Sequence, residues 1–412
     1  VQEASSMFVE RALKQYMGEE PVVMLDLCAA PGGKSTHARS VLPEDSLLVA
    51  NEVIRNRSQI LAENLTKWGY PDVVVTNSDP SDFTPLADFF DIILADVPCS
   101  GEGMFRKDPV AVSEWSPENV EICWQRQRRI ISDIWPCLKP GGILIYSTCT
   151  CNTKENEENI RWIRDEFEAE VLPLDVSEDW NITGNLLQGE DFPVYRFLPH
   201  KTKGEGFFLA VLRKQGGNAC KSGGEPEFVQ GYTPGIQGLN GENSRKKGKN
   251  PHGKGMKTLG LSGEQLSALK KWVLAPEKYE FIQKGSNISA FPKRYLAELS
   301  VLQASLRVVQ AGVELAEEKG KDRMPCHALA MSRILASDAF PREELSYEKA
   351  IAYLRKEAVV LSDASPRGAV LLTYRHVPLG FVKNIGNRAN NLYPQEWRIR
   401  SGYLPEVIST VI

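Results

Sequence analysis

The feature that most constrains this chain is a short apolar segment that contains an acid and runs directly into a Pro-Gly-Gly turn. Residues 22–27 read Val-Val-Met-Leu-Asp-Leu, which predicts a buried parallel strand, and a helix is predicted over 35–41 after the turn. Glycine lets a backbone approach a ligand closely, and a helix start offers free N–H groups. Residues 25–34 therefore predict a cofactor loop at the carboxyl end of the first strand of an open α/β sheet.

This loop matches neither of the two common phosphate-binding patterns. The Walker pattern needs glycine where this chain has Cys28, and the dinucleotide fingerprint needs three spaced glycines where only Gly32 and Gly33 are present. The strand carries an acid, Asp26, and the next predicted strand is followed by Glu52, whose carboxylate can accept both hydroxyls of a ribose. An acid in the first loop suits a ligand with an amino group. Both features fit S-adenosylmethionine.

Composition excludes several classes of protein. The chain has 412 residues, of which 42% are hydrophobic and 25% charged, as in an ordinary globular protein of two or three domains. No apolar run approaches the roughly 18 residues of a membrane span and no signal peptide is visible, so we expect no membrane association and a cytoplasmic location. Eight cysteines are too few for a disulfide scaffold and predict reduced thiols.

Strands and helices alternate through the first half of the chain, which predicts a doubly wound α/β domain over residues 1–214. The later predicted strands are 73–76, 90–96, 142–147 and 206–212, the last as an antiparallel edge. Polar residues stand at the strand ends, where they are expected to converge on one crevice. They are Asp26, Glu52, Asp79, Asp96, Cys99 and Cys149.

The composition changes twice beyond residue 214. Residues 215–262 are rich in glycine and predict a flexible basic linker. Residues 263–335 predict a mainly helical intermediate domain, and residues 336–412 an α+β region with a hairpin turned at 376–379. Acidic residues outnumber basic ones before residue 214, whereas basic ones prevail after it, so nucleic acid would be gripped mainly by the C-terminal half.

The last part of the chain interleaves basic and aromatic side chains. Scattered charges are usually an ordinary solvated face, but rings that stack on bases and cations that pair with phosphates together favour RNA binding. The candidate RNA-binding residues are Lys383, Arg388, Tyr393, Trp397 and Arg398.

Two cysteines follow strands next to the predicted crevice: Cys99 in an Asp-Val-Pro-Cys-Ser-Gly segment and Cys149 in a Ser-Thr-Cys-Thr segment. A free cysteine is most often a small buried hydrophobe, but two at neighbouring loop tips favour chemistry. Carbon 5 of a pyrimidine is not nucleophilic. A thiolate that adds to carbon 6 makes carbon 5 enamine-like, so that it can take a methyl group from a sulfonium. One covalent cysteine, a second thiol to assist release and an acid near the ring edge match this reaction.

Three segments carry a resemblance to a known family: residues 26–34, 96–103 and 147–150. They resemble the signature loops of the Nol/Nop/Sun (Fmu-type) RNA cytosine-5 methyltransferases, over residues 1–214. Residues 2–6, 379–383 and 390–394 are most similar to the RsmF-like branch, which modifies small-subunit ribosomal RNA and carries a C-terminal PUA-like RNA-binding module. The resemblance implies a Rossmann-like class I methyltransferase domain that uses S-adenosylmethionine, and a ribosomal RNA or small ribosomal subunit as partner.

By motif match, the family's nucleophile falls on Cys149 and its release cysteine on Cys99. The resemblance also implies that Glu52 contacts the cofactor ribose, that Asp79 contacts the adenine edge, and that Asp96 lies where the methionine amino group and the target base meet. The other implied cofactor contacts are Cys28, Ala29, Ala30, Pro31, Gly32, Gly33 and Lys34. No metal site is expected.

Three alternatives stay open. Cytosine-5 DNA enzymes attack with the Pro-Cys cysteine, which would make Cys99 the nucleophile and Cys149 structural, although the presence of both loops favours RNA. Transfer RNA could be the substrate within the same family. A catalytically silent RNA-binding or assembly factor could keep the fold, although two intact cysteines argue against it. We expect a monomer, and because the chain starts without Met while the family usually has an N-terminal extension, we expect sequence upstream of residue 1.

Overall fold

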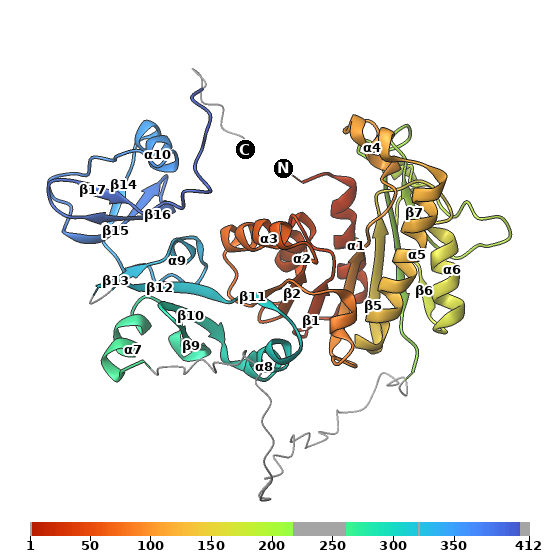
Figure 1. Cartoon of the computed structure of the whole chain (residues 1–412), viewed down its shortest axis with the longest axis horizontal. Helices are drawn as coiled ribbons and strands as arrows, with labels where there is room; N and C mark the ends of the chain where they lie inside the picture. The colour runs from red at the N-terminus through yellow and green to blue at the C-terminus, as the bar shows by residue number, and fades with distance from the viewer. Residues whose placement is uncertain (1, 217–260, 320–321, 404–412) are drawn as a thin grey trace, which may run out of the picture.

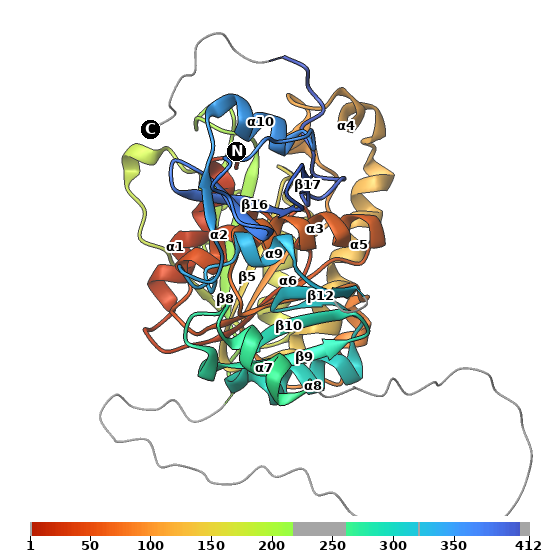
Figure 2. The same ribbon diagram turned by 90° about the vertical axis from the view of Figure 1, so that its left-hand side faces the viewer.

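The computed structural model describes residues 2–216, 261–319 and 322–403, so most of the predicted linker at 215–262 lies outside the described residues. Three parts follow one another from right to left in Figure 1: a large α/β unit, a small sheet with short helices, and a C-terminal α+β region. The side view in Figure 2 shows the small sheet beneath the C-terminal region.

A nine-stranded sheet, counted over the described residues, forms the centre of the α/β unit in the order β11-β3-β2-β1-β4-β5-β8-β6, with β7 also paired to β8. The strands β3, β2, β1, β4 and β5 are parallel, whereas β8 and β11 run antiparallel to their neighbours. The bounds are β1 Val23–Asp26, β2 Leu47–Asn51, β3 Val73–Thr76, β4 Phe90–Asp96, β5 Leu138–Thr148, β6 Glu170–Leu172, β7 Tyr195–Phe197, β8 Phe207–Arg213 and β11 Val308–Ala311. The strand order reverses between β1 and β4, which is where open α/β sheets bind ligands.

Helices cover both faces of this sheet, so the predicted doubly wound architecture is confirmed. Because successive strand residues point to opposite faces, β1 places Met24 in one apolar core and Leu25 in the other. One face is covered by α1 Val9–Tyr16, α2 Gly33–Val41 and α3 Arg55–Trp68, and the other by α5 Pro117–Ile134, α6 Glu157–Glu166 and α8 Leu296–Ser305. In the described ranges, no helix has both the length and the apolar character that a bilayer crossing requires.

The remaining helices before residue 300 are short. A helix α4, Pro109–Glu114, stands near the carboxyl ends of the strands (Figure 1). The 3-10 helices are η1 Ser5–Phe8, η2 Pro80–Phe83, η3 Glu102–Met104, η4 Trp135–Cys137, η5 Glu178–Trp180, η6 Pro276–Lys278 and η7 Lys293–Tyr295. The strand β8 is not an edge as expected, because β6 and β7 both pair with its outer side.

The expectation of a mainly helical domain over 263–335 is wrong. This region holds a four-stranded antiparallel sheet in the order β13-β12-β10-β9, with α7 Gly263–Lys270 and α9 His327–Met331 beside it. Its strands are β9 Tyr279–Lys284, β10 Asn287–Pro292, β12 Val313–Lys319 and β13 Asp322–Pro325. The sequence of β12, Val-Glu-Leu-Ala-Glu-Glu-Lys, consists largely of good helix formers, and tertiary pairing overrides that local preference.

The same region also completes the large unit. The strand β11 extends the nine-stranded sheet beside β3, and Leu299 and Leu302 of α8 are buried in the core that α5 covers. A domain boundary at residue 214 therefore leaves out part of the methyltransferase-like sheet and core.

The C-terminal region is α+β, as predicted. Its sheet has the order β14-β15-β16-β17 and is covered by α10 Tyr347–Leu354. The strands are β14 Arg342–Glu344, β15 Gly368–Tyr374, β16 Val377–Asn384 and β17 Ala389–Asn391. The hairpin between β15 and β16 turns at Arg375 and His376, both with positive φ, at the start of the expected range.

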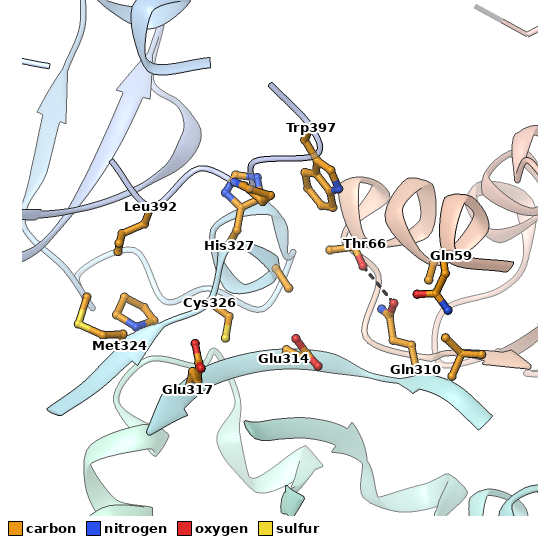
Figure 3. Close-up of a pocket in the computed structure, with 15 residues that line it drawn as sticks. Gln59, Thr66, Gln310, Glu314, Glu317, Met324, Cys326, His327, Leu392 and Trp397 are labelled. Carbon is orange, nitrogen blue, oxygen red and sulfur yellow. Dashed lines mark hydrogen bonds between the residues drawn. The ribbon is translucent and has the colours of Figure 1, made fainter. Parts of the chain in front are cut away.

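The three parts meet around a cavity of about 460 Å³, shown in Figure 3. Its walls come from α3, from the segment β11–α9 and from the C-terminal end of the described chain. Figure 3 labels one side chain from each wall: Gln59 of α3, His327 of α9 and Trp397 of the C-terminal region. The close contact of His327 with Trp397, whose ring centroids lie 5.0 Å apart, links the C-terminal region to α9.

Packing of α8 against the sheet predicts a large stability effect at one position. Leu302 is 0% exposed, whereas its neighbour Val301 in the same helix is 43% exposed. We expect Leu302→Ala to lower the free energy of unfolding by about 2–4 kcal/mol, because it leaves a cavity in the core shared with α5. Val301→Ala is the control and should change it by less than about 0.5 kcal/mol. Equal effects of the two substitutions in denaturant unfolding would show that α8 is not part of that core.

Candidate active site

The predicted cofactor loop lies between β1 and α2 and is fixed by contacts from neighbouring elements. The Ala29 N–H donates to the Asn51 carbonyl at 2.8 Å, and two side chains of α3, Arg57 and Asn64, donate to the carbonyls of Ala30 and Pro31 at 2.9 and 2.7 Å. Gly32 has a φ of 111°, a backbone conformation that side-chain-bearing residues rarely adopt. The loop therefore has a defined shape before any ligand binds.

Two cavities meet beside this loop at the carboxyl ends of β1, β4 and β5. The first, of about 530 Å³, extends toward Glu52 and Asp79, and the second, of about 350 Å³, extends toward Asp26 and Lys34. Four residues line both: Cys28, Ala30, Asp96 and Cys149. The structure thus brings the predicted catalytic and cofactor residues together, although Gly32 lines neither cavity.

The first cavity ends at two carboxylates with different surroundings. Glu52 is 3% exposed, and its Oε1 accepts from the Ile54 N–H at 2.9 Å while Oε2 lies 3.5 Å from Nη2 of Arg57. Asp79 caps η2 and pairs with Arg129 at 3.0 Å, and the hydrogen bond from Arg129 keeps the pKa of Asp79 below its usual value. Glu52 therefore has more free accepting capacity than Asp79.

An unpartnered carboxylate oxygen lies in the second cavity. Asp26 accepts a hydrogen bond from the Ser35 hydroxyl through Oδ2 at 2.6 Å, whereas its buried Oδ1 has no partner. Burial raises the pKa of Asp26 to about 7. A ligand ammonium group would satisfy the free oxygen, so the pocket fits the amino acid end of S-adenosylmethionine. The sequence pattern predicts this acid as a partner for a ligand amino group, although Asp26 is not among the cofactor contacts that the family resemblance implies.

The two candidate cysteines face each other. Sγ of Cys99 and Sγ of Cys149 are 3.3 Å apart. The hydrogen bond donated by the Cys99 thiol lowers the pKa of Cys149, and the positive charge of Lys34 acts in the same direction. The same hydrogen bond, together with burial, raises the pKa of Cys99. The two shifts therefore favour Cys149 as the thiolate and Cys99 as the thiol of the pair.

A carboxylate joins the loops that carry these groups. Asp96 accepts from Lys34 through Oδ2 at 2.8 Å and from the Ser147 hydroxyl through Oδ1 at 2.7 Å. Lys34 opens α2, Asp96 ends β4 and Ser147 lies near the end of β5. The charge of Asp96 is thus held at the point where both cavities reach Cys149.

Residues that the sequence analysis missed hold the Cys149 loop. The Gly103 N–H donates to the Cys149 carbonyl at 2.8 Å, and a Cβ at Gly103 would lie 2.5 Å from that oxygen, so only glycine allows this approach. Glu102 accepts from the Cys151 N–H at 2.9 Å, and Asn152 hydrogen-bonds Glu155. The available signal was the run of polar residues directly after a strand-end cysteine, where local side-chain capping is common.

The candidate RNA-binding residues differ in exposure. Arg388 and Arg398 are exposed and Lys383 is half-buried. Tyr393 is only 8% exposed and packs against Tyr353, 5.4 Å between ring centroids. The expectation that Tyr393 contacts RNA is therefore wrong for its ring, because the aromatic side chain fills the core of the C-terminal region. The interleaved sequence pattern does not distinguish a buried ring from an exposed one.

Comparisons with known proteins agree across the chain. Residues 13–213 match the family described as 16S rRNA methyltransferase RsmB/F, and residues 340–399 match the methyltransferase RsmF PUA domain. Ribosomal RNA small subunit methyltransferase F of Escherichia fergusonii is 32% identical over an alignment of 412 positions that covers 98% of this chain and 78% of that protein. The Citrobacter koseri protein of the same name is 32% identical with the same coverage of both chains.

Similar chains are also found among solved structures. The crystal structure of NSun6 from Pyrococcus horikoshii with SFG is 31% identical, with a TM-score of 0.45 over 52% of this chain and 52% of that chain.

The buried carboxyl of Asp26 predicts how cofactor binding depends on pH. Because burial raises its pKa to about 7, this group is largely protonated at lower pH and pairs with a ligand ammonium only as the pH rises. We expect the affinity for S-adenosylmethionine, measured by calorimetry, to increase as the pH rises through 7. Asp26→Asn should bind more weakly above that pH by about 1.5–3 kcal/mol and lose most of the pH dependence.

In contrast to cofactor affinity, the stability of the cofactor-free protein should decrease as the pH rises toward 7. A carboxyl whose folded pKa is raised costs stability as the pH rises from its unfolded value to the folded one, so cofactor-free Asp26→Asn should melt at a higher temperature than the parent above pH 7. In the binding measurement Glu52→Gln is the control, because it should weaken binding but keep the pH slope that Asp26 contributes. Identical slopes for Asp26→Asn and the parent protein would remove Asp26 from the binding site.

Proposed function

Since this chain belongs to the RsmB/F family of 16S rRNA methyltransferases, we propose that it methylates carbon 5 of a cytosine in small-subunit ribosomal RNA through a covalent bond to Cys149. The observation that carries the proposal is the 3.3 Å approach of Cys99 to Cys149 between two cavities that also share Asp96. An enzyme that methylates an exocyclic amine has no need for such a pair of thiols.

The cofactor would be held by the first loop and by three carboxylates. Glu52 accepts the ribose hydroxyls, Asp26 pairs with the ammonium group, and Asp79 lies at the far end of the first cavity for the adenine edge. When bound, S-adenosylmethionine supplies an electrophilic methyl group. The backbone of residues 28–34 and the buried walls of the cavities exclude water from that group.

Cys149 begins the reaction on the target base. Its thiolate forms a bond to carbon 6 of the cytosine, and the electron pair of the carbon 5–carbon 6 double bond becomes available at carbon 5 for methylation. A thiolate at Cys149 is favoured because the hydrogen bond with Cys99 and the nearby charge of Lys34 both lower the pKa of Cys149.

Release requires the loss of a proton and of the thiolate. The carboxylate of Asp96 takes the proton from carbon 5, and that C–H electron pair restores the double bond while the bond between sulfur and carbon 6 breaks. The electron pair of that bond returns to Sγ of Cys149, where the Cys99 thiol stabilises the leaving thiolate by a hydrogen bond. Asp96 then passes its proton to solvent.

The C-terminal region provides the main RNA-binding contacts. It matches the PUA domain of the family and carries the exposed Arg388 and Arg398. We place the protein in the cytoplasm with the ribosomal substrate. Action as a monomer is part of this proposal.

The roles of the two cysteines can be distinguished by whether a covalent protein–RNA adduct accumulates when each is replaced by alanine. Cys149→Ala should abolish both methylation and covalent attachment to RNA. Cys99→Ala should still attack but release slowly, because the leaving thiolate has lost its hydrogen bond, and a protein–RNA adduct should survive denaturing electrophoresis. Labelled ribosomal RNA and S-adenosylmethionine are the substrates for this test. An adduct with Cys149→Ala and none with Cys99→Ala would reverse the two roles, as in the cytosine-5 DNA enzymes.

If the C-terminal region binds RNA, the affinity for RNA should depend on salt concentration. Contacts to phosphates release counterions, so affinity for RNA should fall steeply with salt. Arg388→Ala and Arg398→Ala should each reduce the slope of log affinity against log salt by about 1 and leave cofactor binding unchanged. Lys270→Ala, at the end of α7, is the control. Unchanged slopes for both arginine variants would mean that these side chains are an ordinary solvated face.

A further inference from the structure

A buried carboxylate that the proposed mechanism does not use lies behind the two cysteines. Glu155 stands in the turn before α6 and is 0% exposed. Among the described residues it forms no ion pair, and its side chain is held by hydrogen-bond donors alone. A buried acid without a counter-ion is costly, and it persists only where its surroundings satisfy it.

The donors come from both cysteine loops. Oε2 accepts from the Ser100 N–H at 3.0 Å, directly after Cys99, and Oε1 accepts from the Asn152 side chain at 2.8 Å, in the Cys149 loop. Gln127 of α5 adds a bond of 2.8 Å to Oε2 and uses the same nitrogen to reach the Pro98 carbonyl at 2.9 Å. One carboxylate thus binds the residue after Cys99 and the Cys149 loop directly, and Gln127 links it to the Pro98 carbonyl, which precedes Cys99.

A second link supports the same alignment. The hydroxyls of Ser100 and Thr150, the residues that follow the two cysteines, lie 2.9 Å apart. The Cys149 loop also has anchors independent of Glu155, namely the Gly103 N–H on the Cys149 carbonyl at 2.8 Å and the Arg196 guanidinium on the Cys151 carbonyl at 2.7 Å. The position of the Cys99 loop relative to Cys149 therefore depends more on Glu155 than the position of Cys149 itself does.

We propose that Glu155 is a positioning residue for the release step: it aligns the Cys99 thiol with Sγ of Cys149. This inference rests on the proposed function, in which Cys99 assists departure of the thiolate. Glu155 does not touch the substrate or the cofactor in this role. It acts through the backbone of Ser100 and the side chain of Asn152.

A carboxamide cannot replace this carboxylate. Three donors converge on its two oxygens, and a carboxamide has one oxygen and one NH₂ group, so Glu155→Gln sets an N–H against at least one donor. Asn152 cannot simply turn over to compensate, because its Oδ1 already accepts from the Glu155 N–H at 2.8 Å. Glu155→Asp keeps the charge but is one methylene shorter, so it cannot bridge both loops.

The test measures adduct and product in the full-length protein with labelled ribosomal RNA and S-adenosylmethionine. Glu155→Gln should lower kcat by about 10²-fold, the loss expected from a misplacement of reacting groups, with the KM for the cofactor unchanged. A covalent adduct should accumulate although Cys99 is intact. Glu155→Asp should accumulate the adduct to a smaller extent, and it provides the answer if Glu155→Gln fails to fold.

The control is Asp72→Asn, which removes a buried carboxylate that pairs with Arg39 at 2.7 Å at the opposite end of the sheet. It should lower stability without any adduct. Cys99→Ala is measured in parallel. If Cys99→Ala accumulates adduct and neither Glu155 variant does, the positioning role of Glu155 is wrong while the proposed function stands. If Cys99→Ala also accumulates none, Cys99-assisted release and the role of Glu155 both fail.

Discussion

The structure of the site depends on one carboxylate that binds three loops. Asp96, at the end of β4, accepts from Lys34 of α2 and from Ser147 of β5, at 2.8 and 2.7 Å. These loops follow the adjacent strands β1, β4 and β5, so the parallel order of the sheet is the condition for their meeting. A charge shared between a lysine and a hydroxyl also costs less to bury than an isolated one. The fold thereby brings together the Asp96 carboxylate, the Lys34 ammonium group and the two cysteine thiols without a long loop.

Much of this arrangement was predictable because it follows from strand ends. An apolar run precedes the loop that begins at Cys28, the acid Glu52 and each of the two cysteine loops. Polar residues that follow parallel strands lie at the same edge of the sheet, so they converge by geometry alone. The core of the first unit was predictable for the same reason. What remained unpredictable is contact between segments distant in sequence: β11 pairs with β3 across more than half of the chain, and no local pattern in residues 308–311 indicates that partner.

The errors have a common physical origin. The strand β12 contains residues that favour helices, and Tyr393 stands among basic residues that suggest an exposed face. In both cases packing decides: β12 is paired on both sides, and the ring of Tyr393 fills the core beside Tyr353. Glu155 shows the reverse problem, because a glutamate before a helix reads as a surface residue. Only the donors gathered around it from the two cysteine loops and α5 reveal that it is buried and satisfied.

A hydrogen bond joins the two cysteine side chains, and their surroundings favour negative charge on one sulfur over the other. The hydrogen bond between them lowers the pKa of Cys149 and raises that of Cys99. Lys34 also favours the thiolate of Cys149 against the opposing effects of burial and of the Asp96 charge, and Glu155 disfavours a thiolate at Cys99. Environments that separate the pKa values of two titratable groups assign their roles as nucleophile and donor. The same Glu155 that holds the Cys99 loop in place thus adds to the hydrogen bond with Cys149 and to burial, which are the larger causes of the raised pKa of Cys99. A thiol that is both aligned and protonated is what the departing Cys149 thiolate requires, which is why the geometry and the electrostatics of the pair support the same division of roles.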